Sequence, residues 1–311
     1  MEIDRRSSMQ KNFLLRSELL ICFCLIAVYL GGASPAPTSS EDLQQKIEQR
    51  IKEFGAESVG IYYEKPDGSI FTHNADAIYH AASTMKVPVM MEVFREVETG
   101  ELSLDQKMKI MNEFTSIVDG SKFSVDPKED SDAELYNWIG KEKPLRELLE
   151  RMITRSSNLA TDLIIGLVTP EKVRALMTKI GAKDMYVLRG VEDIKAYQAG
   201  KINTTSAHSL AICMKELMDP KLFSESSRNE MFEILTHQEF RKGIPKGIHS
   251  DEHHLIIANK TGDLTEINHD AAIIRDSKGA TSILVILTRG VKDDAKGKEL
   301  IAVLAGDIWD Q

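Results

Sequence analysis

Ser83-Thr84-Met85-Lys86 stands where an extended segment gives way to a helix. Beyond it, Val87, Met90 and Phe94 recur at spacings of three and four, which is the period of a helix. Residues three apart share a helix face, so Lys86 would lie beside the Ser83 hydroxyl. A serine becomes a nucleophile when a base is within reach, and a buried lysine can be that base. The alternative is an N-cap serine followed by an exposed lysine, so the rest of the chain has to decide.

Two further short motifs carry related side chains. Arg155-Ser156-Ser157-Asn158 opens a predicted helix, where the Ser156 hydroxyl and the Asn158 amide can both face a cleft. Lys260-Thr261-Gly262 ends a predicted strand, whose alternation points the first and third residues to the same side. In this order the three motifs are far more specific than any one of them, and they form the set found in class A β-lactamases and penicillin-binding proteins.

On these motifs the chain resembles the class A-like serine β-lactamase family over nearly all of its length after the N-terminal segment. The resemblance implies an α+β fold: a five-stranded antiparallel sheet flanked by terminal helices, with an inserted helical domain. It also implies acyl-enzyme chemistry, in which Ser83 attacks a β-lactam carbonyl and Lys86 takes its proton. Ser156 would pass a proton to the departing nitrogen, and Lys260 would keep that path electropositive.

The same resemblance implies how substrate is held. Asn158 would bind the amide side chain of the substrate, and Lys260 and Thr261 its carboxylate. The backbone N–H groups of Ser83 and Asp263 would form the oxyanion hole. The Asp263 carboxylate is unexpected there, because it should weaken the binding of anionic substrates unless it points away. The predicted substrate-binding residues are Asn158, Lys260, Thr261, Gly262 and Asp263.

The residue that would activate water for deacylation has no matching motif in this chain. The family places it in a Glu-x-x-Leu-Asn context, which this chain lacks. Glu192 is the nearest candidate, against the alternative of a solvated loop carboxylate, and Asp193 is weaker. The arginine–aspartate brace of the family would here be Arg189 with Asn203, so we expect that salt bridge to be lost.

Three functions remain open on this sequence. The first is an exported β-lactamase. The second is a penicillin-binding-type transpeptidase, carboxypeptidase or esterase that deacylates slowly, since the Glu-x-x-Leu-Asn context is missing. The third is a non-catalytic module that binds cell wall or β-lactam. The expected partner is accordingly a small-molecule β-lactam or a peptidoglycan stem peptide.

Domain organisation follows from the N-terminus and the element pattern. The apolar run 19–30 follows basic residues and precedes a small-residue segment, which predicts a signal peptide over 1–33 and a periplasmic or secreted product. The catalytic domain would span 34–311, with its α/β part about 40–80 and 245–311 and its helical part about 83–240. An uncleaved membrane anchor is the alternative reading of the same run.

The composition limits the other partners. The formal charge of −9 argues against nucleic acid or an anionic membrane surface. We expect a monomer without cofactor, and no metal, because His237, His249, His253 and His254 match no standard ligand spacing. Cys213 would be the one cysteine left after signal removal and would be buried.

The hydrophobic periodicity gives the expected elements. The polar stretch 118–137 should be a surface loop, and both ends of the chain should contribute strands to one sheet covered by the first and last helices. We expect helices over 40–55, 102–111, 144–153, 156–168, 170–180, 206–218, 226–239 and 295–309. We expect strands over 58–63, 69–73, 255–261, 269–274 and 281–288.

Overall fold

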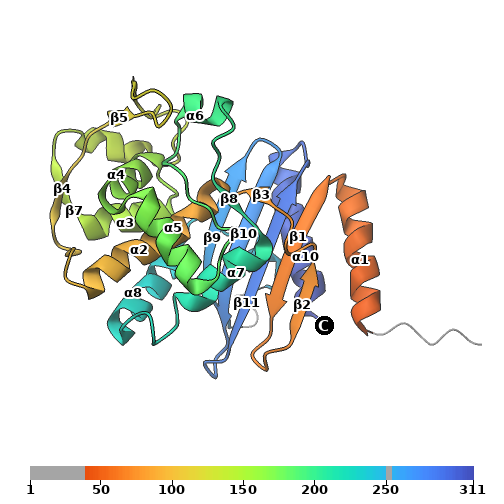
Figure 1. Cartoon of the computed structure of the whole chain (residues 1–311). Helices are drawn as coiled ribbons and strands as arrows, with labels where there is room; N and C mark the ends of the chain where they lie inside the picture. The colour runs from red at the N-terminus through yellow and green to blue at the C-terminus, as the bar shows by residue number, and fades with distance from the viewer. Residues whose placement is uncertain (1–38, 250–253) are drawn as a thin grey trace, which may run out of the picture. The chain divides into compact units, whose positions relative to one another are not determined.

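The structure is a computed structural model that describes residues 39–249 and 254–311. The predicted signal peptide, 1–33, lies outside the described residues. One sheet dominates the molecule, with strand order β2-β1-β11-β10-β9 and antiparallel pairing throughout (Figure 1). The predicted five-stranded antiparallel sheet built from both ends of the chain is therefore confirmed. Its strands are β1 (Ser58–Glu64), β2 (Ile70–His73), β9 (Ile256–Leu264), β10 (Ile267–Arg275) and β11 (Thr281–Arg289).

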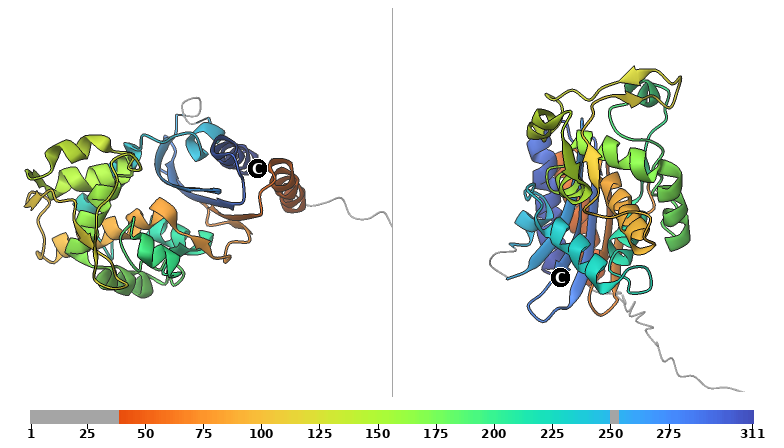
Figure 2. Two further views of the ribbon diagram at one scale, coloured as in Figure 1. Left: turned by 90° about the horizontal axis from the view of Figure 1, so that it is seen from above. Right: turned by 90° about the vertical axis from the view of Figure 1, so that its left-hand side faces the viewer.

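The central strands are apolar on both faces because both faces are covered. β11 is buried from Ser282 to Thr288, and β1 and β10 are buried over most of their length. On one face α1 (Ser39–Phe54) lies beside α10 (Asp294–Trp309), with the short α9 (Ile244–Gly247) nearby, as Figures 1 and 2 show. This arrangement confirms the prediction that the first and last helices cover the sheet.

The other face of the sheet meets the helical part of the chain (Figure 2, left). α7 packs directly on the sheet, and α2, α3, α4, α5 and α8 share one large apolar core with it. Buried Cys213 belongs to this core, as predicted, and its thiol lies 3.4 Å from the Met177 sulfur. The helices are α2 (Lys86–Glu98), α3 (Leu145–Thr154), α4 (Asn158–Val168), α5 (Pro170–Ile180), α6 (Ile194–Gln198), α7 (Ala207–Glu216) and α8 (Glu225–Thr236).

One predicted helix, 102–111, is wrong. The segment instead contains strand β4 (Lys107–Lys109), which pairs with β7 (Glu142–Pro144). Its less exposed residues are Leu102, Leu104, Gln106, Met108 and Ile110, which alternate with exposed ones. An even spacing is the pattern of extended chain rather than of a helix.

The predicted surface loop 118–137 is mostly irregular, but it includes two short regular pieces. These are β6 (Lys122–Phe123), paired with β5 (Phe114–Thr115), and the 3₁₀ helix η2 (Ala133–Trp138). A further short pair, β3 (Tyr79–His80) with β8 (Thr204–Thr205), ties the approach to Ser83 to the segment that precedes α7. Among the described residues, no helix has the length and apolar character that crossing a membrane requires.

Candidate active site

Ser83 lies in a tight turn pressed against the sheet. The turn is the single 3₁₀ turn η1 (Ala82–Met85), and the α-helix begins only at Lys86. Ala82 has a φ of +46°, a conformation that costs a non-glycine residue free energy and that is common beside reacting groups. A Cβ added to Gly262 would lie 3.1 Å from the Ser83 backbone nitrogen, so only glycine lets β9 approach this closely. The third motif therefore positions the first through its glycine.

Lys86 lies beneath the turn and is fully buried. Its Nζ donates to the Ser156 carbonyl oxygen at 2.6 Å, to the Ser156 Oγ at 3.2 Å and to the Asn158 Oδ1 at 3.0 Å. Burial lowers the pKa of Lys86 to about 8, against the opposing effect of nearby carboxylates, of which Asp130 is the strongest. The first motif thus meets the second, and its lysine can exchange a proton near neutral pH.

Ser156 receives a second ammonium from the sheet. Lys260, also fully buried, donates from Nζ to the Ser156 Oγ at 3.0 Å and to the Thr261 carbonyl at 2.8 Å. Burial and the charge of Lys86 hold the pKa of Lys260 well below its usual range. One hydroxyl is therefore hydrogen-bonded to two lysines from segments far apart in the sequence, and the three predicted motifs converge.

Ser156 is held by an unusual backbone and by a residue that the sequence did not indicate. Ser156 has a φ of +57°, and Ser157 then caps α4 by accepting from the Ala160 N–H. Asp130 accepts the backbone N–H groups of Asn158 at 3.0 Å and Leu159 at 2.9 Å. Its carboxylate thus anchors the start of the helix. Asp130 comes from the irregular segment before α3, and no local pattern connects it with the second motif.

Glu192 reaches the same cluster from the loop before α6. Its Oε1 accepts from the Asn158 Nδ2 at 3.1 Å, on the opposite side of that amide from Lys86. Burial raises the pKa of Glu192, and Glu129 and Asp130 raise it further. Asp193 is instead occupied as the cap of α6 and as an acceptor from the Ser116 hydroxyl at 2.9 Å.

The loop that carries Glu192 is braced without a salt bridge, as predicted. The Asn203 amide accepts from the backbone N–H groups of Leu188 and Arg189, and it donates to the Arg189 carbonyl at 3.0 Å. Buried Asp162 accepts the Val191 N–H at 2.7 Å through Oδ1. Its Oδ2 has no hydrogen-bond partner among the described residues, and burial raises the pKa of this carboxyl to about 8.

Some of these residues line one cavity of about 780 Å³, whereas Ser156 and the buried Lys86 and Lys260 are not among its lining residues. Half-buried Ser83 lines it together with Asn158, Glu192 and Asp263. The Asp263 Oδ1 accepts from the Asn268 Nδ2 at 2.9 Å and lies 3.6 Å from the Lys298 Nζ. Asp263 is therefore a lining residue whose carboxylate is partly held by groups outside the cavity.

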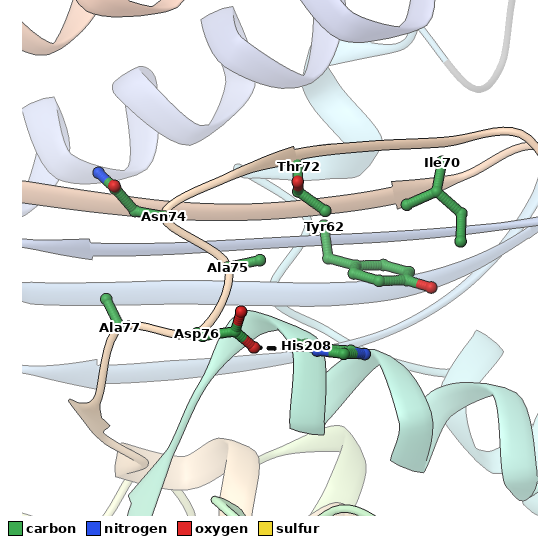
Figure 3. A pocket seen from close by; sticks show the side chains of 8 residues that line it. All are labelled: Tyr62, Ile70, Thr72, Asn74, Ala75, Asp76, Ala77 and His208. Carbon is green, nitrogen blue, oxygen red and sulfur yellow. Dashed lines mark hydrogen bonds and ion pairs between the residues drawn. The ribbon is translucent and has the colours of Figure 1, made fainter.

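A second cavity, of about 600 Å³, lies between the β1–β2 hairpin and α7 (Figure 3). The Tyr62 ring stacks on His208 there, and His208 Nδ1 is 3.0 Å from an Asp76 carboxylate oxygen. None of the three motifs contributes to it. In the part of the chain that the structure describes, no group of three or more His, Cys, Asp and Glu side chains could hold a metal ion. His253 lies outside that part.

Known proteins that resemble this chain point to one family. The model of the beta-lactamase enzyme family matches residues 42–311. A beta-lactamase from Citrobacter koseri is 25% identical over 316 residues, which cover 95% of this chain and 98% of the relative. The crystal structure of a beta-lactamase from Sphaerobacter thermophilus has a TM-score of 0.72 at 24% identity and covers 86% of this chain and 95% of its own.

A mutant of PBP-A, solved as an acyl-enzyme complex with penicillin G, is similar to the same degree. Its TM-score is 0.72 at 23% identity, with 86% of this chain and 95% of that chain covered. Across such neighbours the fold is shared although most of the sequence is not.

Proposed function

This chain belongs to the beta-lactamase enzyme family, and we propose that it opens β-lactam rings through an acyl-enzyme formed on Ser83. The observation that carries the proposal is the Ser156 hydroxyl, hydrogen-bonded to the ammonium groups of both Lys86 and Lys260. A structural serine needs no such pair. A hydroxyl that must deliver a proton beside a nucleophile benefits from such a pair, because nearby cations favour the release of its proton.

In the acylation step the Ser83 oxygen bonds to the lactam carbonyl carbon and the ring C–N bond breaks. Lys86, as the free amine, accepts the Ser83 proton directly or through a water. Ser156 donates its own proton to the departing nitrogen and is reprotonated from Lys86, with which it shares a hydrogen bond. Backbone N–H groups of Ser83 and Asp263 stabilise the negative oxygen of the intermediate.

In the deacylation step the ester on Ser83 must be attacked by water. Glu192 is the base in this proposal, because it borders the Ser83 cavity and is hydrogen-bonded to Asn158. It takes a proton from water, the hydroxide adds to the ester carbonyl, and the bond to Ser83 breaks with return of a proton. The raised pKa of Glu192 brings it closer to the working pH and makes it a better base once ionised.

A second candidate is a penicillin-binding-type transpeptidase, carboxypeptidase or esterase on the same site. One observation favours it: Glu192 stands outside a Glu-x-x-Leu-Asn context and has a φ of +57°. If that backbone places the carboxylate away from the attacking water, the acyl-enzyme is long-lived. A penicilloyl adduct that persists for minutes or longer would favour this candidate over a β-lactamase.

Turnover by the purified mature protein separates the two. We expect steady-state hydrolysis of nitrocefin by wild type, and its loss in Ser83→Ala. The matched control is Ser226→Ala, which removes an exposed hydroxyl on α8. Hydrolysis by Ser83→Ala at the wild-type rate contradicts the role of Ser83 as the nucleophile. A stoichiometric burst without further turnover retains Ser83 and supports the second candidate.

We also propose export, which residues 1–33 support by their basic start, apolar run and small-residue end. The mature N-terminus would then be Ser34. Intact-mass measurement on protein from the periplasm or medium tests this directly, and a full-length chain that stays in the cytoplasm contradicts it.

A further inference from the structure

Most of the ionisable side chains that line the Ser83 cavity are acidic. Its ionisable lining residues include three carboxylates and one arginine, since burial lowers the pKa of His80 to about 4 and leaves it neutral. The Arg189 guanidinium points at backbone: it donates to the carbonyls of Lys201 at 2.9 Å and Gly190 at 2.8 Å. The three carboxylates belong to Glu192, Asp193 and Asp263.

The two lysines of the site do little to offset this charge at a ligand. Lys86 and Lys260 are fully buried, and their ammonium donors are directed at Ser156, Asn158 and the Thr261 carbonyl. The charge of each lysine is therefore engaged by these partners rather than presented to the cavity.

Asp263 is next to last in β9 and lines the cavity. Its Oδ1 is held by Asn268, and its ion-pair partner Lys298 is shared with Asp294, whose Oδ2 is the closer at 2.8 Å. Two carboxylates thus face one ammonium. Asp263 lines the cavity and therefore shares its ion-pair partner with a carboxylate that lies outside the cavity.

We propose that this site selects acyl donors whose variable side chain is neutral or cationic over donors that carry an additional carboxylate, with Asp263 as a specificity-determining residue. The inference rests on the proposed function, because discrimination is expressed in the acylation of Ser83. The carboxylates that line the cavity slow the approach of an additional anion and raise the free energy of its complex. This electrostatic effect weakens as ionic strength rises.

The test uses three penicillins with one nucleus and one phenyl side chain: ampicillin carries an amine, benzylpenicillin no charge and carbenicillin a carboxylate on the side chain. The second-order rate constant for adduct formation on Ser83 is measured by intact mass. We expect the order ampicillin, benzylpenicillin, carbenicillin, with about threefold or more between successive members at low salt and a smaller spread at high salt.

Asp263→Asn keeps an amide oxygen for Asn268 and removes the charge. It should lower the ampicillin-to-carbenicillin ratio about fivefold, mainly through faster reaction with carbenicillin. Glu299→Gln removes an exposed charge next to Lys298 on α10 and should leave the ratio unchanged. If Asp263→Asn does not fold, the wild-type ranking at low and high salt still tests the inference, because the spread among the three rate constants should shrink at high salt.

Two results overturn the inference alone: equal or reversed ranking in wild type, or a ratio that Asp263→Asn leaves unchanged while adducts form on Ser83. Absence of both adduct and hydrolysis with all three penicillins overturns the proposed function and, with it, this inference.

Discussion

Glu192→Gln tests the deacylation step of the mechanism. In the wild type the Asn158 Nδ2 donates to the Glu192 Oε1 at 3.1 Å. Glutamine keeps an oxygen that can accept this hydrogen bond, so Asn158 should stay oriented between the loop and Lys86. The substitution removes the ability to take a proton from water. It also removes a half-buried carboxyl whose pKa is raised by burial, so the fold should not suffer.

The magnitude follows from what a general base contributes. Loss of one slows its step about 10²–10⁴-fold, which is about 3–5 kcal/mol in the barrier. We expect that loss in deacylation, while acylation changes by less than about threefold because Lys86 and Ser156 are untouched. The acyl-enzyme should therefore accumulate to full occupancy.

Rapid-quench intact-mass measurement with benzylpenicillin gives both rates in one experiment. The control is Glu129→Gln, an exposed acid whose charge raises the pKa of Glu192 but which is not hydrogen-bonded to Asn158. It should shift the pH dependence of deacylation to lower pH with little change in its maximum. A deacylation rate that Glu192→Gln leaves intact refutes the role of Glu192, and an equal loss in both variants assigns the effect to charge alone.

Three further predictions concern the buried groups. Acylation by wild type should rise with pH and level off above about 8, the pKa of Lys86, since the free amine is the base; stopped-flow acylation between pH 6 and 10 measures it, and a flat profile contradicts it. Lys86→Met should slow acylation about 10²–10⁴-fold and should also lower the melting temperature, because the buried Ser156 and Asn158 oxygens lose their donor; unimpaired acylation would exclude Lys86 as the base. Folded Asp162 holds its proton up to about pH 8 whereas the unfolded carboxyl loses it near pH 4, so the free energy of unfolding should fall as pH rises between these values, by at most about 1.4 kcal/mol per pH unit. Asp162→Asn should reduce that fall in urea titrations, and an unchanged slope would mean that Asp162 ionises freely in the folded protein.

The fold could be predicted largely from local patterns because the sheet strands have continuous apolar runs and the helices have clear starts and stops. Ser157, for instance, caps α4 one residue from the predicted start. The predicted helix over 102–111 is wrong because the apolar residues of this segment also fit spacings close to a helical turn. Pairing with β7, which is distant in sequence, decides its structure, and periodicity cannot indicate such a partner.

The site divides in the same way. Lys86 and Asn158 could be found because each belongs to a short motif with a chemical meaning. Asp130 and Asp162 could not, because each acts on backbone N–H groups 28 or 29 residues away in the chain. Residues that position others through the backbone leave no local pattern, and only the folded arrangement identifies them.

The central claim is that three separate segments surround one acyl carbon attached to Ser83. Peptide mapping by mass spectrometry, after wild-type protein is quenched within milliseconds of mixing with benzylpenicillin, tests it most directly. We predict a single penicilloyl group on the peptide that contains Ser83. An adduct on any other residue, or none at any time point, would contradict it.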